Sequence, residues 1–394
     1  MSIDLLQVKG VKCSSIASGI KKNNILDLSL ISLSKGSSTA AVFTRNIFCA
    51  APVIVSKNHV NSNIEALLIN SGNANAGTGE RGLDDCYNTC VYLAEELEIK
   101  PEQVLPFSTG VIGEFLPLEV FKSNVNILVS SLSKNGMSKV ANGILTTDLV
   151  EKSYSTSINI GGKTVTLSGV AKGSGMIRPD MATMLSFIVS DISASKEELQ
   201  DCLTHAVNQS FNRITVDGDT STNDACSLSA TNQSGVQLSQ CKGEFQKALN
   251  LVSKKLAQMI VKDGEGATKF VEIKIEGLES SEDCLEVAYT IAHSPLVKTA
   301  LFAGDANWGR ILAAVGRAKV NGVSIENIDI YINGLQIIVS GEKSSTYTEE
   351  LGSAEMQKSE IIIRVNLGTT SLSESVWTTD LSYDYVKINA EYRS

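Results

Sequence analysis

The spacing of apolar residues changes between two periods along the chain, which predicts a mixed protein of the α/β or α+β class. Apolar positions recur every three or four residues over 83–93, 199–207 and 245–260, as on one buried face of a helix. Ser195 and Glu198 stand where a capping box would begin the second of these helices. These segments are therefore predicted to be amphipathic helices packed on a core.

Other runs are short and rich in β-branched or apolar residues, which predicts strands. They are Ala66–Asn70, Thr164–Val170, Ser186–Asp191 and Phe270–Ile275. Asn333-Gly334 lies between two further runs of this kind and predicts a hairpin with a two-residue turn. The polar stretch Leu278–Asp283 is the predicted boundary before a smaller C-terminal α/β domain.

Composition and charge limit the classes of partner. The chain has 394 residues, of which 43% are hydrophobic and 20% charged, as in a globular protein of two or three domains. The net charge is −9 and the basic residues are scattered, so no nucleic-acid partner is expected. The first ten residues lack an apolar signal core, and no apolar run reaches the roughly 20 residues that span a bilayer. We therefore expect a cytoplasmic protein without a membrane partner.

The sequence also argues against a metal or a bound cofactor. Eight cysteines form no CxxC pair and only three histidines are present, so buried free thiols in a reducing cytosol are expected instead of a zinc site. Three loops begin like a Walker loop, a dinucleotide loop and a calcium loop. In each of them another residue stands where glycine is required: Ser157, Arg178 and Thr222.

Thr183, within PDMATMLSFIVSD, is open to two interpretations. Its hydroxyl could bond a neighbouring backbone group where the predicted strand 186–191 begins, and the local sequence alone favours this. Alternatively, cleavage of the Ala182–Thr183 bond would make Thr183 a nucleophile with its own α-amine as base, since that amine has a pKa of about 7.7–8. The three histidines, His59, His205 and His293, are expected to be structural or on the surface, so none is predicted to serve as that base.

A resemblance to a known family changes this balance. The chain closely resembles the ornithine acetyltransferases of arginine biosynthesis, many of which also act as glutamate N-acetyltransferases (N-acetylglutamate synthases). The resemblance spans nearly the whole chain in order, and it rests on these stretches: SGNANAGTGERG (71–82), STGVIGE (108–114), GSGMIRPDMATMLSFIVSD (173–191), TVDGDTSTND (215–224), KDGEGATK (262–269), GDANWGR (304–310) and the ending INAEYRS.

The resemblance implies self-cleavage between Ala182 and Thr183. The products would be an alpha chain, 1–182, and a beta chain, 183–394, which stay together as two copies of each. The implied fold has an N-terminal-nucleophile-like layered core to about residue 280 and the smaller domain at about 281–394. Thr183 would be the nucleophile, with Thr109 and Gly110 as the oxyanion hole. The implied substrate-binding residues are Thr146, Lys172, Thr183, Glu265, Asn389 and Ser394; the family ends more commonly in threonine.

The implied reaction moves an acetyl group from N2-acetyl-L-ornithine to L-glutamate through an acetyl-Thr183 intermediate, in ping-pong order and without a cofactor. The sequence leaves open whether acetyl-CoA is a second donor. Two alternatives also stay open. A self-processing threonine amidohydrolase or aminopeptidase would pass its acyl group to water, and a non-catalytic amino-acid-binding protein would remain one uncleaved chain. The motifs at 215–224 and 304–310 receive no role beyond packing.

Overall fold

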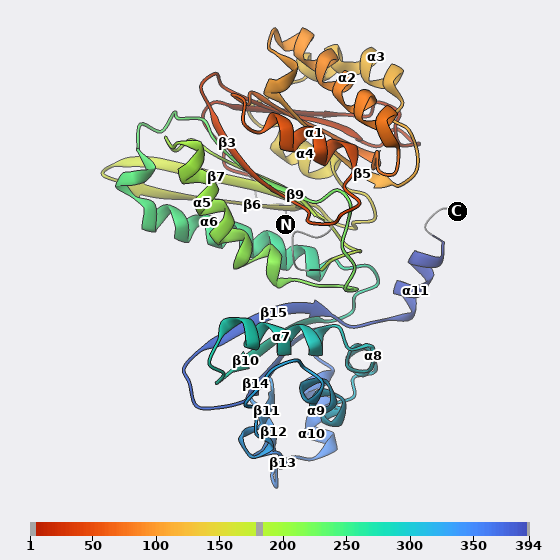
Figure 1. The fold of residues 1–394 in the computed structure, drawn as a ribbon, viewed down its shortest axis with the longest axis vertical. Helices are drawn as coiled ribbons and strands as arrows, with labels where there is room; N and C mark the ends of the chain where they lie inside the picture. The colour runs from red at the N-terminus through yellow and green to blue at the C-terminus, as the bar shows by residue number, and fades with distance from the viewer. Residues whose placement is uncertain (1–4, 179–183, 392–394) are drawn as a thin grey trace. The chain divides into compact units, whose positions relative to one another are not determined.

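The structure, a computed structural model, describes residues 5–178 and 184–391 (Figure 1). Contacts divide the chain into two compact units, which are described separately. Unit 1 comprises Met1–Asn212 and Asp219–Ile260, and unit 2 comprises Arg213–Gly218 and Val261–Ser394. The boundary predicted near residue 280 falls inside unit 2.

One sheet of unit 1 contains a parallel strand pair that will position candidate site residues. Its strand order is β1-β2-β4-β5, formed by β1 (Val11–Ile16), β2 (Leu28–Leu33), β4 (Ala66–Asn73) and β5 (Val104–Val111). β4 and β5 run parallel, whereas the other pairs are antiparallel. The carboxyl ends of β4 and β5 therefore meet at one edge. The predicted strand Ala66–Asn70 is confirmed.

The second sheet of unit 1 has the order β3-β9-β8-β7-β6. Its strands are β3 (Ser38–Phe43), β6 (Lys152–Ile160), β7 (Lys163–Lys172), β8 (Leu185–Ser190) and β9 (Ala225–Ala230). β8 and β9 pair in parallel and are buried along their whole length, as expected for strands covered on both faces. The strands predicted around Thr164–Val170 and Ser186–Asp191 correspond to β7 and β8.

The two sheets of unit 1 face each other across an apolar core. Phe107 of β5 meets Phe187 of β8 edge to face, with ring centroids 4.9 Å apart. Helix α4 (Met137–Gly143) adds Met137 and Val140 to the same core. An aromatic pair of this geometry contributes roughly 0.5–1.5 kcal/mol beyond its buried area.

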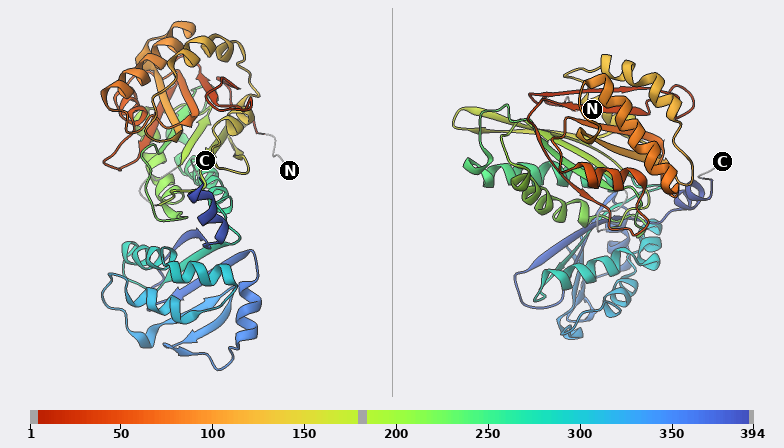
Figure 2. Two further views of the ribbon diagram at one scale, coloured as in Figure 1. Left: turned by 90° about the vertical axis from the view of Figure 1, so that its right-hand side faces the viewer. Right: turned by 45° about the horizontal axis from the view of Figure 1, so that its top comes forward.

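Helices cover the outer faces of both sheets. α1 (Ala51–His59), α2 (Gly79–Leu97) and α3 (Leu118–Ser130) pack on the first sheet, and Figure 2 shows the long α2, in orange, among them. α5 (Lys196–Asn208) and α6 (Lys242–Lys262) pack on the second, α5 against β3 and β9 and α6 against β7. Gly169 lets α6 approach β7 closely, because a Cβ there would lie 2.9 Å from Leu256 and 3.0 Å from Val252. The mixed α/β class and the layered core are thus confirmed.

The local signals for helix starts and turns are confirmed as well. At α5 the Ser195 Oγ accepts from Glu198 N at 3.2 Å, and Ser195 N donates to Glu198 Oε2 at 2.9 Å. In unit 2, Asn333 and Gly334 have φ values of 49° and 92°. Positive φ at both positions is what a type I′ hairpin turn requires.

Unit 2 is built on one mixed sheet with the order β13-β12-β11-β14-β10-β15. The strands are β10 (Phe270–Glu276), β11 (Asp329–Ile332), β12 (Leu335–Val339), β13 (Glu342–Lys343), β14 (Glu360–Asn366) and β15 (Ser373–Thr379). Val271, Ile273 and Ile275 of β10 are buried and alternate with less buried residues, so the sheet has one core face. The predicted strand Phe270–Ile275 is confirmed.

Helices of unit 2 supply the other side of that core. They are α7 (Ser281–Ala292), α8 (Pro295–Ala303), α9 (Trp308–Gly316) and α10 (Glu349–Met356), and α11 (Tyr383–Ala390) follows β15. Short 3-10 helices of the two units lie at Pro101–Gln103, Phe211–Arg213, Leu238–Gln240 and Ile325–Asn327.

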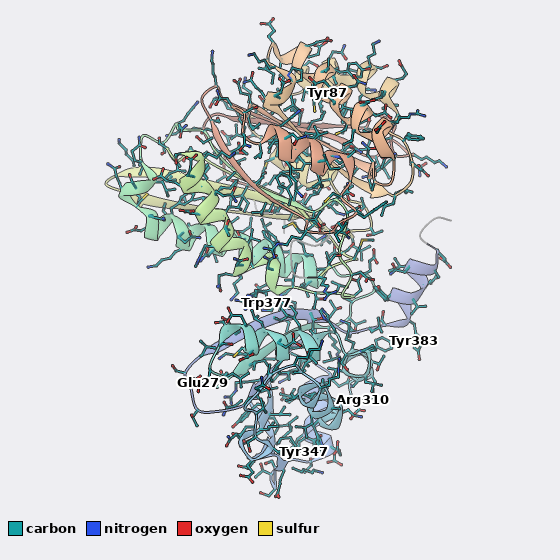
Figure 3. The ribbon with its side chains drawn as sticks, viewed as in Figure 1. Tyr87, Glu279, Arg310, Tyr347, Trp377 and Tyr383 are labelled. Carbon is teal, nitrogen blue, oxygen red and sulfur yellow. The ribbon has the colours of Figure 1, made fainter. Side chains whose placement is uncertain are left out.

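Two contacts extend unit 2 beyond its sheet. The segment Arg213–Gly218 joins it because Thr215 N donates to the Trp377 carbonyl of β15 at 3.0 Å. Tyr383, the first residue of α11, meets Phe302 of α8 edge to face with centroids 5.5 Å apart; Figure 3 labels both Trp377 and Tyr383. The C-terminal helix is therefore anchored to unit 2.

The cysteines agree with the thiols expected from the sequence. Seven of the eight are buried and Cys49 is partly buried, and none is in a disulfide. Burial raises the pKa of Cys13, Cys90 and Cys226 to about 12, so these thiols stay protonated and unreactive at neutral pH. Within residues 5–178 and 184–391, no helix is long and apolar enough to cross a membrane.

Candidate active site

The proposed oxyanion pair lies where β4 and β5 end together. In the parallel register, Thr109 lies beside Ser71 and Gly110 beside Gly72. Gly110 has φ +136°, and a Cβ there would stand 2.3 Å from Gly72 C and 2.5 Å from Asn73 N. A side chain at residue 110 would therefore force the two strand ends apart.

Two predicted site residues, Thr109 and Thr146, meet at the ammonium group of a third, Lys172. Its Nζ donates to Thr109 Oγ1 at 3.1 Å and to Thr146 Oγ1 at 2.9 Å, and the lysine is only 4% exposed. Since an ammonium only donates, both hydroxyls accept from Lys172 and keep their own hydrogens to offer to a ligand. The arrangement presents a buried positive charge flanked by two hydroxyl donors.

The position of Lys172 in the sheet relates it to the Thr183 segment. Lys172 is the last residue of β7 and pairs with Leu185, the first residue of β8. Thr183 precedes Leu185 by two positions in the sequence. Ala182 and Thr183 themselves lie outside the described residues, as does Ser394.

Asp148 is a site residue that the sequence reasoning missed. Its Oδ1 accepts from Gly173 N at 2.7 Å and from Lys152 Nζ at 2.6 Å, and its Oδ2 accepts from Thr146 N at 3.0 Å. Burial raises the pKa of this carboxyl, but the charges of Lys172 and Lys152 and the hydrogen bonds outweigh it, so the pKa lies well below its usual range. Asp148 is thus a buried anion paired with Lys152, and it holds the backbone of Thr146 and of Gly173, the residue directly after Lys172.

We predict that Asp148→Asn lowers the free energy of unfolding by about 3–5 kcal/mol at neutral pH. The Lys152–Asp148 pair is 0% exposed, and removing one partner leaves a buried charge uncompensated. A carboxyl whose folded pKa is depressed stabilises above its unfolded pKa of about 3.9 and loses that effect as pH falls. Thermal melts of the wild type and Asp148→Asn from pH 7 to pH 3 should show that the difference in their stability becomes smaller in acid. A difference that does not change with pH would contradict this electrostatic role.

Lys21 is a second cation close to this cluster. Its Nζ donates to the Leu145 carbonyl at 2.6 Å, next to Thr146. Burial and, to a lesser extent, the charge of Lys172 lower the pKa of Lys21 to about 8, against the opposing effects of Asp27 and Asp148. No spacing in the sequence links Lys21 to residue 145, so the contact could be found only in the fold.

Glu265 and Asn389 form a second group, inside unit 2. Asn389 Nδ2 donates to Glu265 Oε2 at 2.9 Å. The loop that contains Glu265 also anchors the start of α11, because Ser382 Oγ donates to the Gly266 carbonyl at 2.7 Å. A Cβ at Gly266 would lie 2.4 Å from Tyr385 N, so the approach of the helix requires glycine. Residues 383–391 of the C-terminal tail therefore fold back onto the predicted glutamate.

The remaining candidates have structural partners. His59 Nδ1 lies 2.8 Å from the Val104 carbonyl, His293 Nε2 lies 2.9 Å from Thr215 Oγ1, and His205 is exposed on α5. The structural or surface role predicted for all three is confirmed. In the 304–310 motif, Arg310 donates to the Leu296 carbonyl at 2.7 Å, which ties α9 to α8. In the part of the chain that the structure describes, no group of His, Cys, Asp and Glu could hold a metal ion.

Comparison with known proteins identifies the family. The chain matches the family model described as "ArgJ family" over residues 12–394. The chain belongs to the ArgJ family. The resemblance seen in its motifs is thereby confirmed.

Relatives within the ArgJ family match along nearly their whole length. The chain is 48% identical to the arginine biosynthesis bifunctional protein ArgJ of Pseudomonas syringae pv. tomato, over 98% of this chain and 97% of that one. It is also 48% identical to the protein of the same name from Methylococcus capsulatus, over 100% of this chain and 97% of that one. A crystal structure of arginine biosynthesis bifunctional protein argJ from Bacillus halodurans is 40% identical, with a TM-score of 0.51, and the match covers 53% of this chain and 100% of that chain.

Proposed function

We propose that this protein is an acetyltransferase of arginine biosynthesis that moves the acetyl group of N2-acetyl-L-ornithine to L-glutamate. The observation that carries the proposal is the buried ammonium of Lys172, which donates to the Thr109 and Thr146 hydroxyls. Lys172 pairs with Leu185 at the start of β8, the strand that follows Thr183 in the sequence. The full-length relationship to proteins named for arginine biosynthesis supports the choice of pathway.

The proposed reaction has two half-reactions at Thr183. Its Oγ attacks the acetyl carbonyl carbon of acetylornithine, and its α-amine takes the hydroxyl proton. The carbonyl oxygen becomes an oxyanion, which the Thr109 hydroxyl and the Gly110 backbone stabilise. The C–N bond then breaks, the proton goes to the leaving amine, and ornithine departs. The amine of glutamate attacks the resulting acetyl ester in the same way, which restores the Thr183 hydroxyl.

Charge complementarity assigns the substrate groups. Lys172 is suited to a carboxylate, and Glu265 is suited to an ammonium. Ornithine and glutamate share the α-amino acid head and differ in the charge of the side chain. Groups that bind the shared head can therefore serve both substrates in turn, and we propose Thr146, Asn389 and Ser394 as further groups of this kind.

Self-processing is part of the proposal. Cutting the Ala182–Thr183 bond would free the α-amine that acts as base, and two alpha and two beta chains would form the enzyme. The Bacillus halodurans chain supports this, because it matches in full yet covers 53% of this chain, close to the share that residues 183–394 make up. We also propose a cytoplasmic location, where the free thiols would stay reduced.

We further propose that acetyl-CoA is a second acetyl donor, which would make the protein an N-acetylglutamate synthase as well. The word bifunctional in the names of its relatives supports this. Only the thioester carbonyl of acetyl-CoA has to enter the site, so the reaction itself needs no bound cofactor.

The deciding experiment combines mass spectrometry with a transfer assay. With acetylornithine alone, the enzyme should release one ornithine per site, and its 183–394 fragment should gain the mass of one acetyl group. Addition of glutamate should then remove that acetyl group. Parallel double-reciprocal lines would agree with this ping-pong order. Intersecting lines without a trapped adduct would favour direct transfer. Acetyl passed to water alone would indicate an amidohydrolase, and an inert single chain would indicate a binding protein.

We predict that Asn389→Ala raises KM for both amino-acid substrates by roughly tenfold or more, the usual cost of a hydrogen bond to a charged group. The variant loses the contact that orients Glu265, while cleavage should proceed normally because its participants lie in unit 1. Asn327→Ala, at an exposed position of unit 2, is the matched control. Deleting residues 389–394 should have a larger effect of the same kind; normal kinetics would place the tail outside the substrate site.

A further inference from the structure

Asn223 lies in the motif at 215–224, to which the sequence analysis gave no role beyond packing. It holds the backbone of β5 next to Thr109 and Gly110, the predicted oxyanion hole. Its Nδ2 donates to the Ala74 carbonyl at 2.7 Å and to the Ser108 carbonyl at 2.9 Å. Its Oδ1 accepts from Thr222 Oγ1 at 2.6 Å, and the side chain is buried. Both hydrogens of the amide are therefore committed, one of them to the residue directly before Thr109.

Asp224, the next residue, holds the backbone of Met184 just before β8 begins. Its Oδ1 accepts from Met184 N at 2.7 Å, and it is only 1% exposed. The Met184 carbonyl accepts from Ala225 N at 3.2 Å, which begins the parallel pairing of β8 with β9. The backbone of Met184, the residue directly after Thr183, is thus held at both its N–H and its carbonyl.

Two consecutive residues therefore connect the start of β8 to the end of β5. All these contacts lie within unit 1, and all are buried. Asn223 sets the backbone before Thr109, and Asp224 sets the backbone after Thr183. A nucleophile and its oxyanion donors must match within a fraction of an ångström, since a shift of about 1 Å can cost 10²-fold in rate.

We propose that Asn223 and Asp224 form a clasp that positions the Thr183 nucleophile against the Thr109–Gly110 pair. This inference rests on the proposed function of Thr183. The clasp contributes no proton and no charge to the reaction; Asp224 acts as a hydrogen-bond acceptor, and Asn223 acts as a double donor. Both are positioning residues for cleavage and for acetyl transfer.

The test compares three substitutions in the full-length protein. Asp224→Ala removes the acceptor and should slow both cleavage and kcat by roughly 10²-fold, with little change in KM. Asp224→Asn keeps an acceptor oxygen and should restore at least a tenth of the wild-type rates. Asp191→Ala is the matched control, because Asp191 is equally buried, accepts from Thr166 N at 2.9 Å, and follows the opposite end of β8. It should lower stability and leave cleavage and kcat unchanged.

A second measurement does not depend on activity. Hydrogen exchange at the Met184 amide should be at least tenfold faster in Asp224→Ala than in the wild type and unchanged in Asp191→Ala. Should Asp224→Ala fail to fold, Asn223→Ser takes its place. Serine has one shorter donor where asparagine has two, so it cannot hold both the Ala74 and Ser108 carbonyls and should also lower kcat.

The outcomes separate the clasp from the function on which it rests. If the wild type cleaves and transfers acetyl while Asp224→Ala does so equally well, the clasp is wrong and the proposed function stands. If Asp224→Asn is as slow as Asp224→Ala, a charge is required and the positioning role is wrong. If the wild type neither cleaves nor transfers acetyl, the proposed function is wrong. If hydrogen exchange at the Met184 amide is the same in Asp224→Ala as in the wild type, the clasp is wrong.

Discussion

Thr183→Ala should remain one chain of 394 residues and should form no acetyl-enzyme, whereas the wild type should separate under denaturing conditions into fragments 1–182 and 183–394. Alanine has no hydroxyl to attack the Ala182 carbonyl, so the bond persists. Without cleavage no α-amine is released at residue 183, so the variant lacks both the nucleophile and its base. Intact-mass measurement should give a single mass, and acetylglutamate formation should fall to the uncatalysed background.

Two controls test whether the Thr183 hydroxyl of the same chain makes the cut. Thr183→Ser keeps a hydroxyl and should still cleave. This variant therefore distinguishes the loss of the nucleophile from an effect of the changed side-chain shape. Mixing Thr183→Ala with the wild type should leave the variant intact, because the cut is made within each chain. A Thr183→Ala protein cut at the same bond would show that another group, or another protein, does the processing.

The elements of the fold were predictable where the chain carries a local pattern. The capping box at Ser195 and Glu198 and the turn at Asn333-Gly334 depend on residues close in sequence, and both are found. The division into units was less accessible. Segment 213–218 belongs to unit 2 because its backbone is hydrogen-bonded to β15. The pattern of apolar residues in the segment does not indicate this pairing.

The candidate site was predictable only through resemblance. Thr109, Thr146 and Lys172 are far apart in sequence. Their convergence depends on the ends of β5 and β7, and so on tertiary packing. Asp148 was missed because a single acidic residue in a loop carries no signal; its depressed pKa arises from two lysines that the fold brings to it.

Replacing Thr109 by valine should lower kcat by roughly 10²–10³, the usual cost of one lost oxyanion donor. Valine keeps the shape of the buried side chain and removes only its hydroxyl. In the wild type this hydroxyl accepts from Lys172 at 3.1 Å, so its hydrogen is available to the oxyanion. The neighbouring ammonium also polarises the O–H group, which strengthens it as a donor.

The pattern of kinetic constants decides whether Thr109 has this role. Thr146 accepts from the same ammonium at 2.9 Å but is proposed to bind substrate, so Thr146→Val should raise KM more than it lowers kcat. Thr109→Val should do the reverse, and Thr109→Ser should retain most of the wild-type kcat. Because the same donor can assist cleavage, rates are measured on protein already shown by mass to be cut. A normal kcat in cleaved Thr109→Val would remove Thr109 from the oxyanion hole and leave that role to backbone groups such as Gly110.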